Sequence, residues 1–333
     1  MELEHIRWLV SYDARAVLGP GIRRAPGIRQ ILSFSIFLLV GLAAPPPVAA
    51  QASSQPKPPE EAPASAAAQP AEEEDDEAVL DPAEPDFVTI NLPTTLRLPL
   101  HKGNFRLNHR FAGNLRNADF GELAGNLFGI DQGAIIGFEY RVAVVRHVQA
   151  AAYRSSFDRT IQLYGKYDAI RQRGSMPVSV SALVSIEGAN NFKRDYAQAV
   201  GAVISHRFAQ RAAVYVTPVW VNNSAPSLDA IAHDHGASSP GAEEHDHRST
   251  FYVGLGARVR VRSTVYLVGE VAPRFGGYAP NTVEYGFGIE KRAGAHLFSL
   301  TVTNTFGTTF AQLARGGTVN SLYLGFNLAR KYF

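Results

Sequence analysis

The sequence predicts an all-β protein: an antiparallel transmembrane β-barrel of about 12 strands, preceded by a disordered N-terminal linker. From residue 104 onward, apolar and polar residues alternate in runs of about ten, the length of a tilted strand that crosses a bilayer. The connections between these runs are short and long in turn, and the number of runs is even, as in outer-membrane barrels. No helical pattern separates the runs, which excludes a parallel sheet.

Composition narrows the class further. The 333 residues include no cysteine, which excludes a disulfide scaffold, a thiolate metal site and a lipid-anchored N-terminal cysteine. No apolar run reaches the ~20 residues of a membrane helix. Residues 51–86 carry eleven acidic residues against one lysine, whereas residues 87–333 carry 26 basic against 16 acidic residues. An acidic segment therefore precedes a mildly basic body.

Residues 1–50 have the pattern of a secretory signal peptide. Arg23, Arg24 and Arg29 precede an apolar stretch at residues 31–44, and small residues follow it. This order of basic, apolar and small residues predicts export from the cytoplasm. The alternative is an uncleaved membrane anchor, which the short apolar stretch disfavours.

Residues 51–86 are rich in Pro, Ala, Ser and Glu, too polar to offset the entropy cost of folding, and are predicted to be a disordered linker. A solvated spacer is the favoured interpretation. The alternative is a tether that meets a periplasmic partner or the barrel's own basic rim. Residues 87–103 are predicted to be an extended lead-in, because Pro93 and Pro99 argue against a central strand. The barrel itself is predicted over residues 104–333.

The clearest pair of strands lies within residues 250–274. Apolar residues such as Leu255 and Val259 alternate there with polar ones such as Arg258 and Glu270, and a tight turn is predicted at residues 262–263. The other runs show the same alternation, although it is weaker in the third run, at residues 147–156. Periodicity alone also allows a soluble sandwich, which the export signal, the strand length and the chain end disfavour. The remaining predicted strands cover residues 104–112, 132–141, 147–156, 159–171, 177–188, 195–206, 212–221, 282–291, 295–304 and 321–333.

The chain ends on Tyr332 and Phe333, an aromatic end typical of strands that the barrel-assembly machinery recognises during biogenesis. The apolar face of the last strand runs through even numbers, so Phe333 is out of phase. Two explanations remain open at this point. A bulge shifts the last turn, or Tyr332 belongs to the aromatic girdle and Phe333 curls into the periplasm.

Charged residues on the opposite faces of these strands are predicted to point into the lumen. They either line an aqueous path whose charges set ion preference, or form a ladder of ion pairs that closes a narrow lumen. The modest excess of arginine favours anions in any path. The predicted lumen charges are Arg106, Arg110, Glu139, Arg141, Lys166, Glu187, Arg258, Arg260, Glu270, Arg274, Glu284 and Glu290.

Two kinds of loop feature stand out. His233, His235, His245 and His247 lie near carboxylates in a long polar loop, which is a candidate weak metal site, with a flexible surface loop as the favoured alternative. Residues 117–128 and 308–315 are each predicted to contain a short helix that either enters the barrel mouth or packs on its rim.

Enzymatic motifs are weak. Ser205 and His206 are adjacent in sequence, which places them on opposite faces of a strand and not in one triad. His109 falls on the apolar face beside Phe111. The sequence contains no phosphate-binding loop, zinc-protease motif or nucleotide fingerprint. It predicts no cofactor, no enzymatic activity and no nucleic-acid partner.

The barrel region resembles a family of uncharacterised bacterial outer-membrane β-barrel proteins, a domain of unknown function. The matching segments are FRLNHRF (residues 105–111), GNLFGIDQGA (125–134), TIQLYGKYDAIRQ (160–172), EGANNF (187–192), VYLVGEVAPRFGGY (265–278), GIEKRAGAHLFSL (288–300), NTFGTT (304–309) and LGFNLARKYF (324–333). The resemblance covers about residues 104–333. It implies a barrel in the outer membrane of a Gram-negative-type bacterium, in contact with outer-membrane lipid, and it implies no reaction.

Three roles are therefore expected, in this order. The first is a pore or transport barrel for small solutes with a mixed-charge lumen. The second is a closed structural or docking barrel with a periplasmic partner. The third is an outer-membrane hydrolase.

Overall fold

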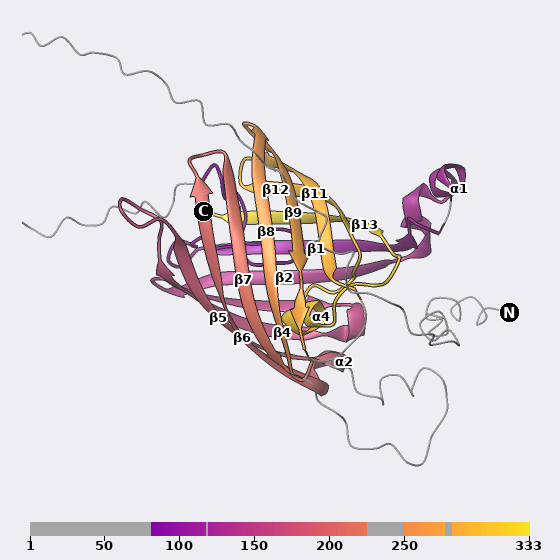
Figure 1. The fold of residues 1–333 in the computed structure, drawn as a ribbon, viewed down its shortest axis with the longest axis horizontal. Coiled ribbons are helices and arrows are strands. Elements are labelled where there is room, and N and C mark those ends of the chain that lie inside the picture. Colours follow the sequence, from indigo (N-terminus) through magenta and orange to yellow (C-terminus); the bar gives the residue numbers. More distant parts are fainter. Residues whose placement is uncertain (1–80, 118, 225–248, 277–281) are drawn as a thin grey trace, which may run out of the picture. The chain divides into compact units, whose positions relative to one another are not determined.

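The alternating runs form strands because successive side chains of an extended chain point to opposite faces of a sheet. The computed structural model describes residues 81–117, 119–224, 249–276 and 282–333. There the runs form an antiparallel barrel of twelve long strands and one two-residue strand (Figure 1), which confirms the predicted fold class. The strands are β1 (Gly103–Asn114), β2 (Ala134–Val145), β3 (Val148–Ser155), β4 (Ile161–Ile170), β5 (Ser179–Gly188), β6 (Arg194–Phe208), β7 (Ala212–Asn222), β8 (Thr250–Arg262), β9 (Val265–Ala272), β10 (Arg274–Phe275), β11 (Glu284–Ala293), β12 (His296–Thr303) and β13 (Tyr323–Tyr332).

The barrel is closed by two pairings. The first and last strands pair, with Gly103 opposite Tyr332, and β8 pairs with β9 on the other side of the ring. Closure pairs the edges that an open sheet would leave with free backbone donors and acceptors. Hydrocarbon offers no hydrogen bonds, so a closed ring is the β structure that it tolerates.

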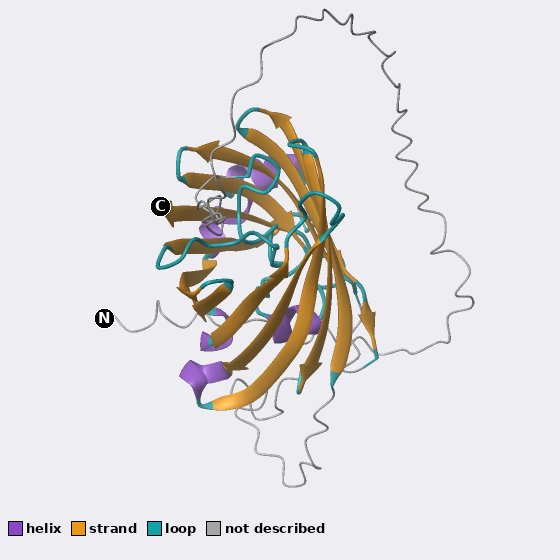
Figure 2. Ribbon diagram, turned by 90° about the vertical axis from the view of Figure 1, so that its left-hand side faces the viewer, coloured by secondary structure: helices purple, strands orange, loops and turns teal. Residues whose placement is uncertain are grey.

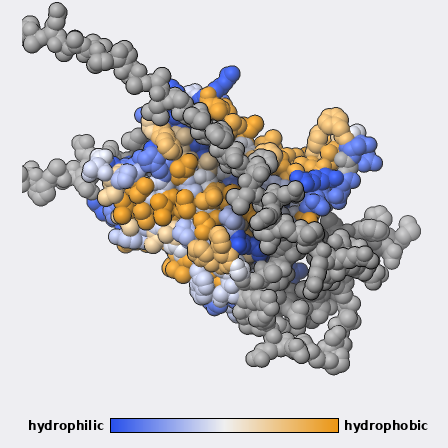
Figure 3. All heavy atoms as spheres, in the orientation of Figure 1, coloured by the Kyte–Doolittle hydropathy of each residue, from blue (hydrophilic) through white to orange (hydrophobic). Residues whose placement is uncertain are grey.

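The two faces of the wall meet different surroundings. Outward residues such as Val184 and Leu300 are more than half exposed, whereas inward residues such as Tyr252 and Arg258 are fully buried. Figure 3 shows hydrophobic residues gathered over the side of the barrel. The predicted hairpin at residues 250–274 has the expected faces, but its turn lies at residues 263–264, one residue later than predicted. A register shift between Arg260 and Arg262 accounts for the difference.

Short and long connections segregate to the two ends of the barrel, as predicted. The end that carries the short turns and the C-terminus is called the turn end, and the other end is called the loop end. The turns after β2, β4, β6, β8 and β11 lie at the turn end. One connection at the loop end is also short, the 3-10 turn η4 (Phe157–Arg159) between β3 and β4.

The two predicted helices lie in different surroundings. Both α1 (Phe120–Gly125) and α4 (Phe310–Ala314) begin with a capping box, formed by Asp119 and Glu122 in α1 and by Thr309 and Gln312 in α4. No residue of α1 is buried, and Figure 1 shows it projecting from the barrel. All five residues of α4 are buried, and α4 contacts β6, β7 and β8. The other short segments are η3 (Leu127–Gln132) and α2 (Ala189–Phe192).

The last strand contains no bulge that would explain why Phe333 is out of phase with the apolar face. Tyr332 keeps its register with Gly103 and faces outward, 47% exposed. Phe333 turns inward and packs against a cluster that includes Phe87 and Leu98. The second explanation therefore holds for the outward Tyr332, whereas Phe333 packs inward and does not curl into the periplasm. None of the helices in the described residues is long and apolar enough to cross a membrane.

Candidate functional site in the barrel lumen

The lumen is occupied by the chain segment that precedes β1. Residues 81–98, called the plug hairpin, fold back on themselves with a bridge between Val88 and Pro93. The backbone N–H of Thr89 donates to the Leu92 carbonyl at 2.8 Å, and that of Thr94 donates to the Phe87 carbonyl at 2.9 Å. Residues 83–95 are all buried. Figure 2 shows loop segments lying inside the curve of the strands.

This hairpin corrects two boundaries. The predicted lead-in at residues 87–103 is not extended, and residues 81–86 of the predicted disordered linker are placed and largely buried. Pro93 excludes a central strand but is compatible with a hairpin, where its missing N–H breaks no ladder. Barrel side chains supply partners for the polar plug residues, which offsets the entropy cost of ordering them.

The plug hairpin begins and ends at the turn end of the barrel. Near the start, Arg207 beside the β6–β7 turn pairs with Asp81, and Lys331 of β13 donates to the Pro85 carbonyl at 2.5 Å. After the plug, the His101 N–H donates to Ala143 near the end of β2, and β1 then starts. The hairpin tip at residues 89–92 therefore points from the turn end into the barrel.

The tip encloses one carboxylate of the wall. Glu270 on β9 accepts five hydrogen bonds, one from the Thr89 hydroxyl at 2.6 Å and four from the backbone N–H groups of Ile90, Asn91 and Leu92 at 2.8–3.1 Å. Successive N–H groups of a tight turn make an anion-binding concavity. Hydrogen bonds to a charged acceptor are stronger than neutral ones, so Glu270 is the main anchor of the tip.

Basic wall residues hold the rest of the plug hairpin. Arg106 of β1 pairs with Asp86 at 2.5 Å and donates to the Ile90 carbonyl at 2.8 Å. Lys166 of β4 donates to the carbonyls of Thr94 and Leu96 at 2.9 and 2.8 Å. The wall thus presents charged donors to the backbone carbonyls of the plug.

A second set of wall charges pair with one another. Glu139 and Arg141 of β2 lie 2.9 Å apart, and Lys166 and Asp168 of β4 lie 3.0 Å apart. Arg258 of β8 is 2.7 Å from Glu290 of β11, and neither side chain is exposed. Removal from water costs each of these ions solvation, and the pairing compensates for that cost.

Ten of the twelve predicted lumen charges lie on the inward face and are buried. Two lie elsewhere. Arg260 is close to the β8–β9 turn and half-buried, and Arg274 lies in β10 at the loop end, where it donates to the Ala314 carbonyl at 3.1 Å. The ten are Arg106, Arg110, Glu139, Arg141, Lys166, Glu187, Arg258, Glu270, Glu284 and Glu290.

Sequence reasoning missed the plug's own polar residues and one wall lysine. Asp86 and Asn91 were assigned to the linker and the lead-in, yet both contact arginines of β1. Lys331 is buried, and its alternation with Asn327 and Ala329 was the available signal. The equivalent signal in the plug was the shift at residue 81 from an Ala- and Glu-rich composition to alternating residues.

The loop end is covered by α4. Glu187 of β5 accepts a hydrogen bond from the Thr309 hydroxyl at 2.8 Å and one from the Ala311 N–H at 3.2 Å. Arg315 pairs with Asp158 of η4 at 3.0 Å, which fixes the far side of the helix. The plug hairpin and α4 therefore fill the lumen from opposite ends.

One plug carboxyl has no ion-pair partner among the described residues. Burial raises the pKa of Glu84, and the nearby Lys166, Arg207 and Arg258 oppose the shift while Asp81 adds to it. A raised pKa means that the folded protein binds this proton more tightly than the unfolded chain does. The proton therefore stabilises the fold at low pH, and this contribution is lost as the pH rises through the pKa of Glu84 in the folded protein.

Gly254 makes room for the plug, because a Cβ at this position of β8 would lie 2.6 Å from a methyl carbon of Leu92. We expect Gly254→Ala to destabilise the docked plug by about 1–3 kcal/mol. Faster tryptic cleavage after Arg97 in the folded protein would report it. Leu92→Ala should restore protection in the double variant. Gly269→Ala, whose Cβ would meet nothing closer than 3.7 Å, is the matched control and should cleave as the wild type does.

The other residues that the sequence singled out form no comparable cluster in the described part of the chain. The four loop histidines lie outside the described residues, among which no group of three or more His, Asp or Glu is placed to hold a metal. Ser205 contacts Thr95 in the lumen at 2.5 Å, whereas His206 bonds the Pro177 carbonyl at 2.6 Å and is not buried, so the two diverge as predicted. His109 stacks on Phe326 on the outer face.

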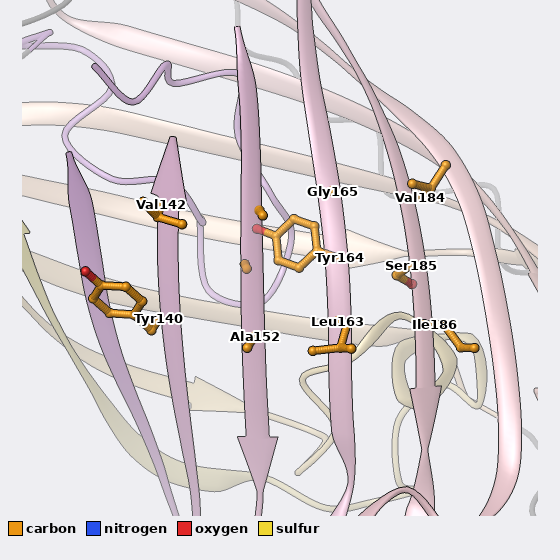
Figure 4. A pocket seen from close by; sticks show the side chains of 11 residues that line it. Tyr140, Val142, Ala152, Leu163, Tyr164, Gly165, Val184, Ser185 and Ile186 are labelled. Atoms are coloured by element: carbon orange, nitrogen blue, oxygen red, sulfur yellow. The ribbon is translucent and has the colours of Figure 1, made fainter. Parts of the chain in front are cut away.

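The outer face has one apolar hollow over β2 to β5. Ala150 and Ala152 form a low area between larger neighbours, with Tyr140 and Leu163 at its sides (Figure 4). Its lining carries no charged side chain. The hollow therefore suits hydrocarbon.

Comparison with solved structures returns channel-forming barrels at low identity. A NanC porin shares 6% identity over 69% of this chain and 100% of its own, with a TM-score of 0.44, and a KdgM porin shares 6% over 70% and 99%, with a TM-score of 0.41. An outer membrane channel from Pseudomonas putida F1 shares 10% over 71% and 97%, with a TM-score of 0.40. None of these likenesses assigns a function to this chain.

Sequence comparison is more decisive. No curated protein matches. A family model described as a membrane bound beta barrel domain (DUF5777) matches residues 86–332, which include all thirteen strands and most of the plug hairpin. The match begins at Asp86, the plug residue that pairs with Arg106. The chain therefore belongs to this family of membrane-bound β-barrel domains.

Proposed function

We propose that the protein is an outer-membrane barrel that passes small solutes, and that its plug hairpin closes the lumen until it withdraws. The export signal predicted at residues 1–50 supports an outer-membrane location, since barrels of this layout occur there. Short turns and the chain end gather on the periplasmic side of such barrels. The turn end then faces the periplasm, and the plug enters from that side.

The observation that carries the proposal is the position of the two arms of the plug at one end. A hairpin inserted from the turn end withdraws toward that end without threading through the barrel. The contacts that break are those between wall side chains and the plug, including the five hydrogen bonds to Glu270. The inter-strand ladders remain intact.

The chemistry of the wall supports the same role. A permanently filled interior gains little from buried charges, because apolar replacements of buried ion pairs are often as stable or more stable. This wall instead places Arg106, Arg110, Glu270 and Glu284 directly on the plug. Such residues are satisfied by the docked plug and equally by water after withdrawal. They suit a lumen that exists in two states.

The current through planar bilayers tests the proposal. A full-length chain in which Gly/Ser residues replace residues 81–98 should conduct steadily, whereas the wild type should open rarely. The same replacement in residues 51–68 keeps the plug and is the matched control. Heat-modifiable gel mobility establishes that each barrel is folded.

A closed structural or docking barrel is the second candidate, favoured by the burial of both the plug hairpin and α4. It predicts that the plug-replaced barrel folds and stays silent. That result would overturn the transport proposal and favour a barrel that docks a periplasmic partner through the segment before the plug.

A further inference from the structure

We infer that withdrawal of the plug uncovers a binding site for a small zwitterion with the chemistry of an α-amino acid. The site lies between Arg106 and Arg110 of β1 and Glu270 and Glu284 of β9 and β11. This inference rests on the proposed function, because solute reaches these residues only after the plug leaves.

The occupant of the site in the docked state is Asn91, at the plug tip. Its amide oxygen accepts a hydrogen bond from Arg110 at 3.2 Å. Its amide nitrogen donates to Glu284 at 3.2 Å, and its backbone N–H donates to Glu270 at 2.8 Å. One small unit thus presents an acceptor to the arginine side and donors to the glutamate side.

The rest of the plug repeats this polarity. On the arginine side, Arg106 binds the Asp86 carboxylate and the Ile90 carbonyl. On the glutamate side, Glu270 meets only donors, namely a hydroxyl and backbone N–H groups. The plug therefore offers a carboxylate and carbonyls to the cations, and N–H and O–H groups to the anions.

Withdrawal leaves the arginines with hydrogen-bond partners on the wall but takes away those of the glutamates. Every hydrogen bond that the described residues donate to Glu270 comes from plug residues 89–92. Among the described residues, Glu284 receives one hydrogen bond, from Asn91, and none of them donates to its Oε2 atom, although the side chain is fully buried. Arg106 and Arg110 each keep one side-chain partner on the wall, Asn108 and Asn327.

The two glutamates are close neighbours. Glu270 lies opposite Gly286 in the β9–β11 ladder, and Glu284 is two residues away on the same face. Diagonal neighbours of this kind are within reach of long side chains. Two carboxylates that lose their donors repel each other, and an ammonium group placed between them relieves the repulsion.

A zwitterion fits this arrangement better than either ion alone. A carboxylate binds an arginine through paired, charge-assisted hydrogen bonds, and an ammonium group donates three bonds to carboxylates. An anion such as acetate satisfies the arginines but approaches two glutamates, and a cation such as methylammonium meets the converse problem. In an α-amino acid the two groups are joined through one carbon, in the same order as the acceptor and donors of Asn91.

Glycine is the probe for this site, with acetate, methylammonium and glycerol for comparison. In the plug-replaced barrel, calorimetry should show that glycine binds more tightly than the other three. Arg110→Gln and Glu284→Gln should each weaken glycine binding about ten-fold, because each removes a charged partner. Arg262→Gln, at the exposed turn end, should leave it unchanged.

The wild-type barrel gives a second measurement. Glycine competes with Asn91 for the same residues, so it should raise the fraction of time that the wild-type barrel is open. Acetate and methylammonium should not. A plug-replaced barrel that conducts but binds glycine no better than glycerol would overturn this inference and leave the proposed function standing. A folded plug-replaced barrel without current would overturn the proposed function itself.

Discussion

Glu270→Ala is expected to open the lumen of the full-length protein. The substitution leaves three backbone N–H groups of the buried tip without their acceptor and leaves the Thr89 hydroxyl with only the Leu92 carbonyl, at 3.2 Å. Loss of one partner of a buried charged network costs on the order of 3–5 kcal/mol. A loss of that size shifts the balance between docked and withdrawn plug by roughly 10²–10⁴-fold.

Single-channel recording measures this effect as the fraction of time that the barrel conducts. Glu122→Ala removes an exposed carboxylate of α1 and should behave as the wild type does. Glu270→Gln keeps one acceptor oxygen but points an amide at the remaining donors, so an intermediate open fraction is expected. A folded Glu270→Ala barrel with the wild-type open fraction would show that the tip does not hold the plug in place.

Arg258→Ala is expected to have the largest effect on barrel stability. Arg258 donates to both oxygens of Glu290, at 2.7 and 3.0 Å, and to the Val88 carbonyl of the plug at 2.8 Å. Alanine leaves the Glu290 carboxylate buried and unpaired, because its other hydrogen bond, from Ser299, is long at 3.4 Å. Breaking such a pair costs about 3–5 kcal/mol.

Urea unfolding in lipid vesicles measures the loss. The double variant Arg258→Met with Glu290→Gln removes both charges while keeping their volume, and should recover most of the stability. Arg262→Ala, on the same strand but exposed, is the matched control. An Arg258→Ala barrel that unfolds at the wild-type urea concentration would mean that the pair contributes little, and that Glu290 takes up its proton instead.

The wall of the barrel was predictable because the two-residue alternation of apolar and polar side chains determines which face each residue occupies. Alternation in residues 250–274 assigns Leu255 to the outside and Arg258 to the inside, and the structure agrees. A strand in a closed barrel has only two faces, so the polar face must point inward when the outside is hydrocarbon. Arg274 keeps the same phase, opposite the inward residue Tyr252, but it lies at the loop end and is only half-buried.

The plug was not predictable in the same way. Pro93 and Pro99 correctly exclude a central strand, but absence of a strand does not indicate where a segment lies. Its residues become buried through partners that are remote in sequence, such as Asn91 with Glu284. Local patterns carry no information on such contacts. The two short helices make the same point, since similar capping signals gave an exposed α1 and a buried α4.

The most direct test of the plugged lumen is a removable cross-link. The chain has no cysteine, and the Thr95 and Ser205 hydroxyl oxygens lie 2.5 Å apart between plug and wall. Thr95→Cys and Ser205→Cys, introduced together with Glu270→Ala, should give a barrel that conducts when reduced and is silent when the disulfide forms. Each single-cysteine variant should conduct under both conditions. Current that persists with the disulfide verified by mass spectrometry would contradict the account, because solute would then pass without displacing the plug hairpin.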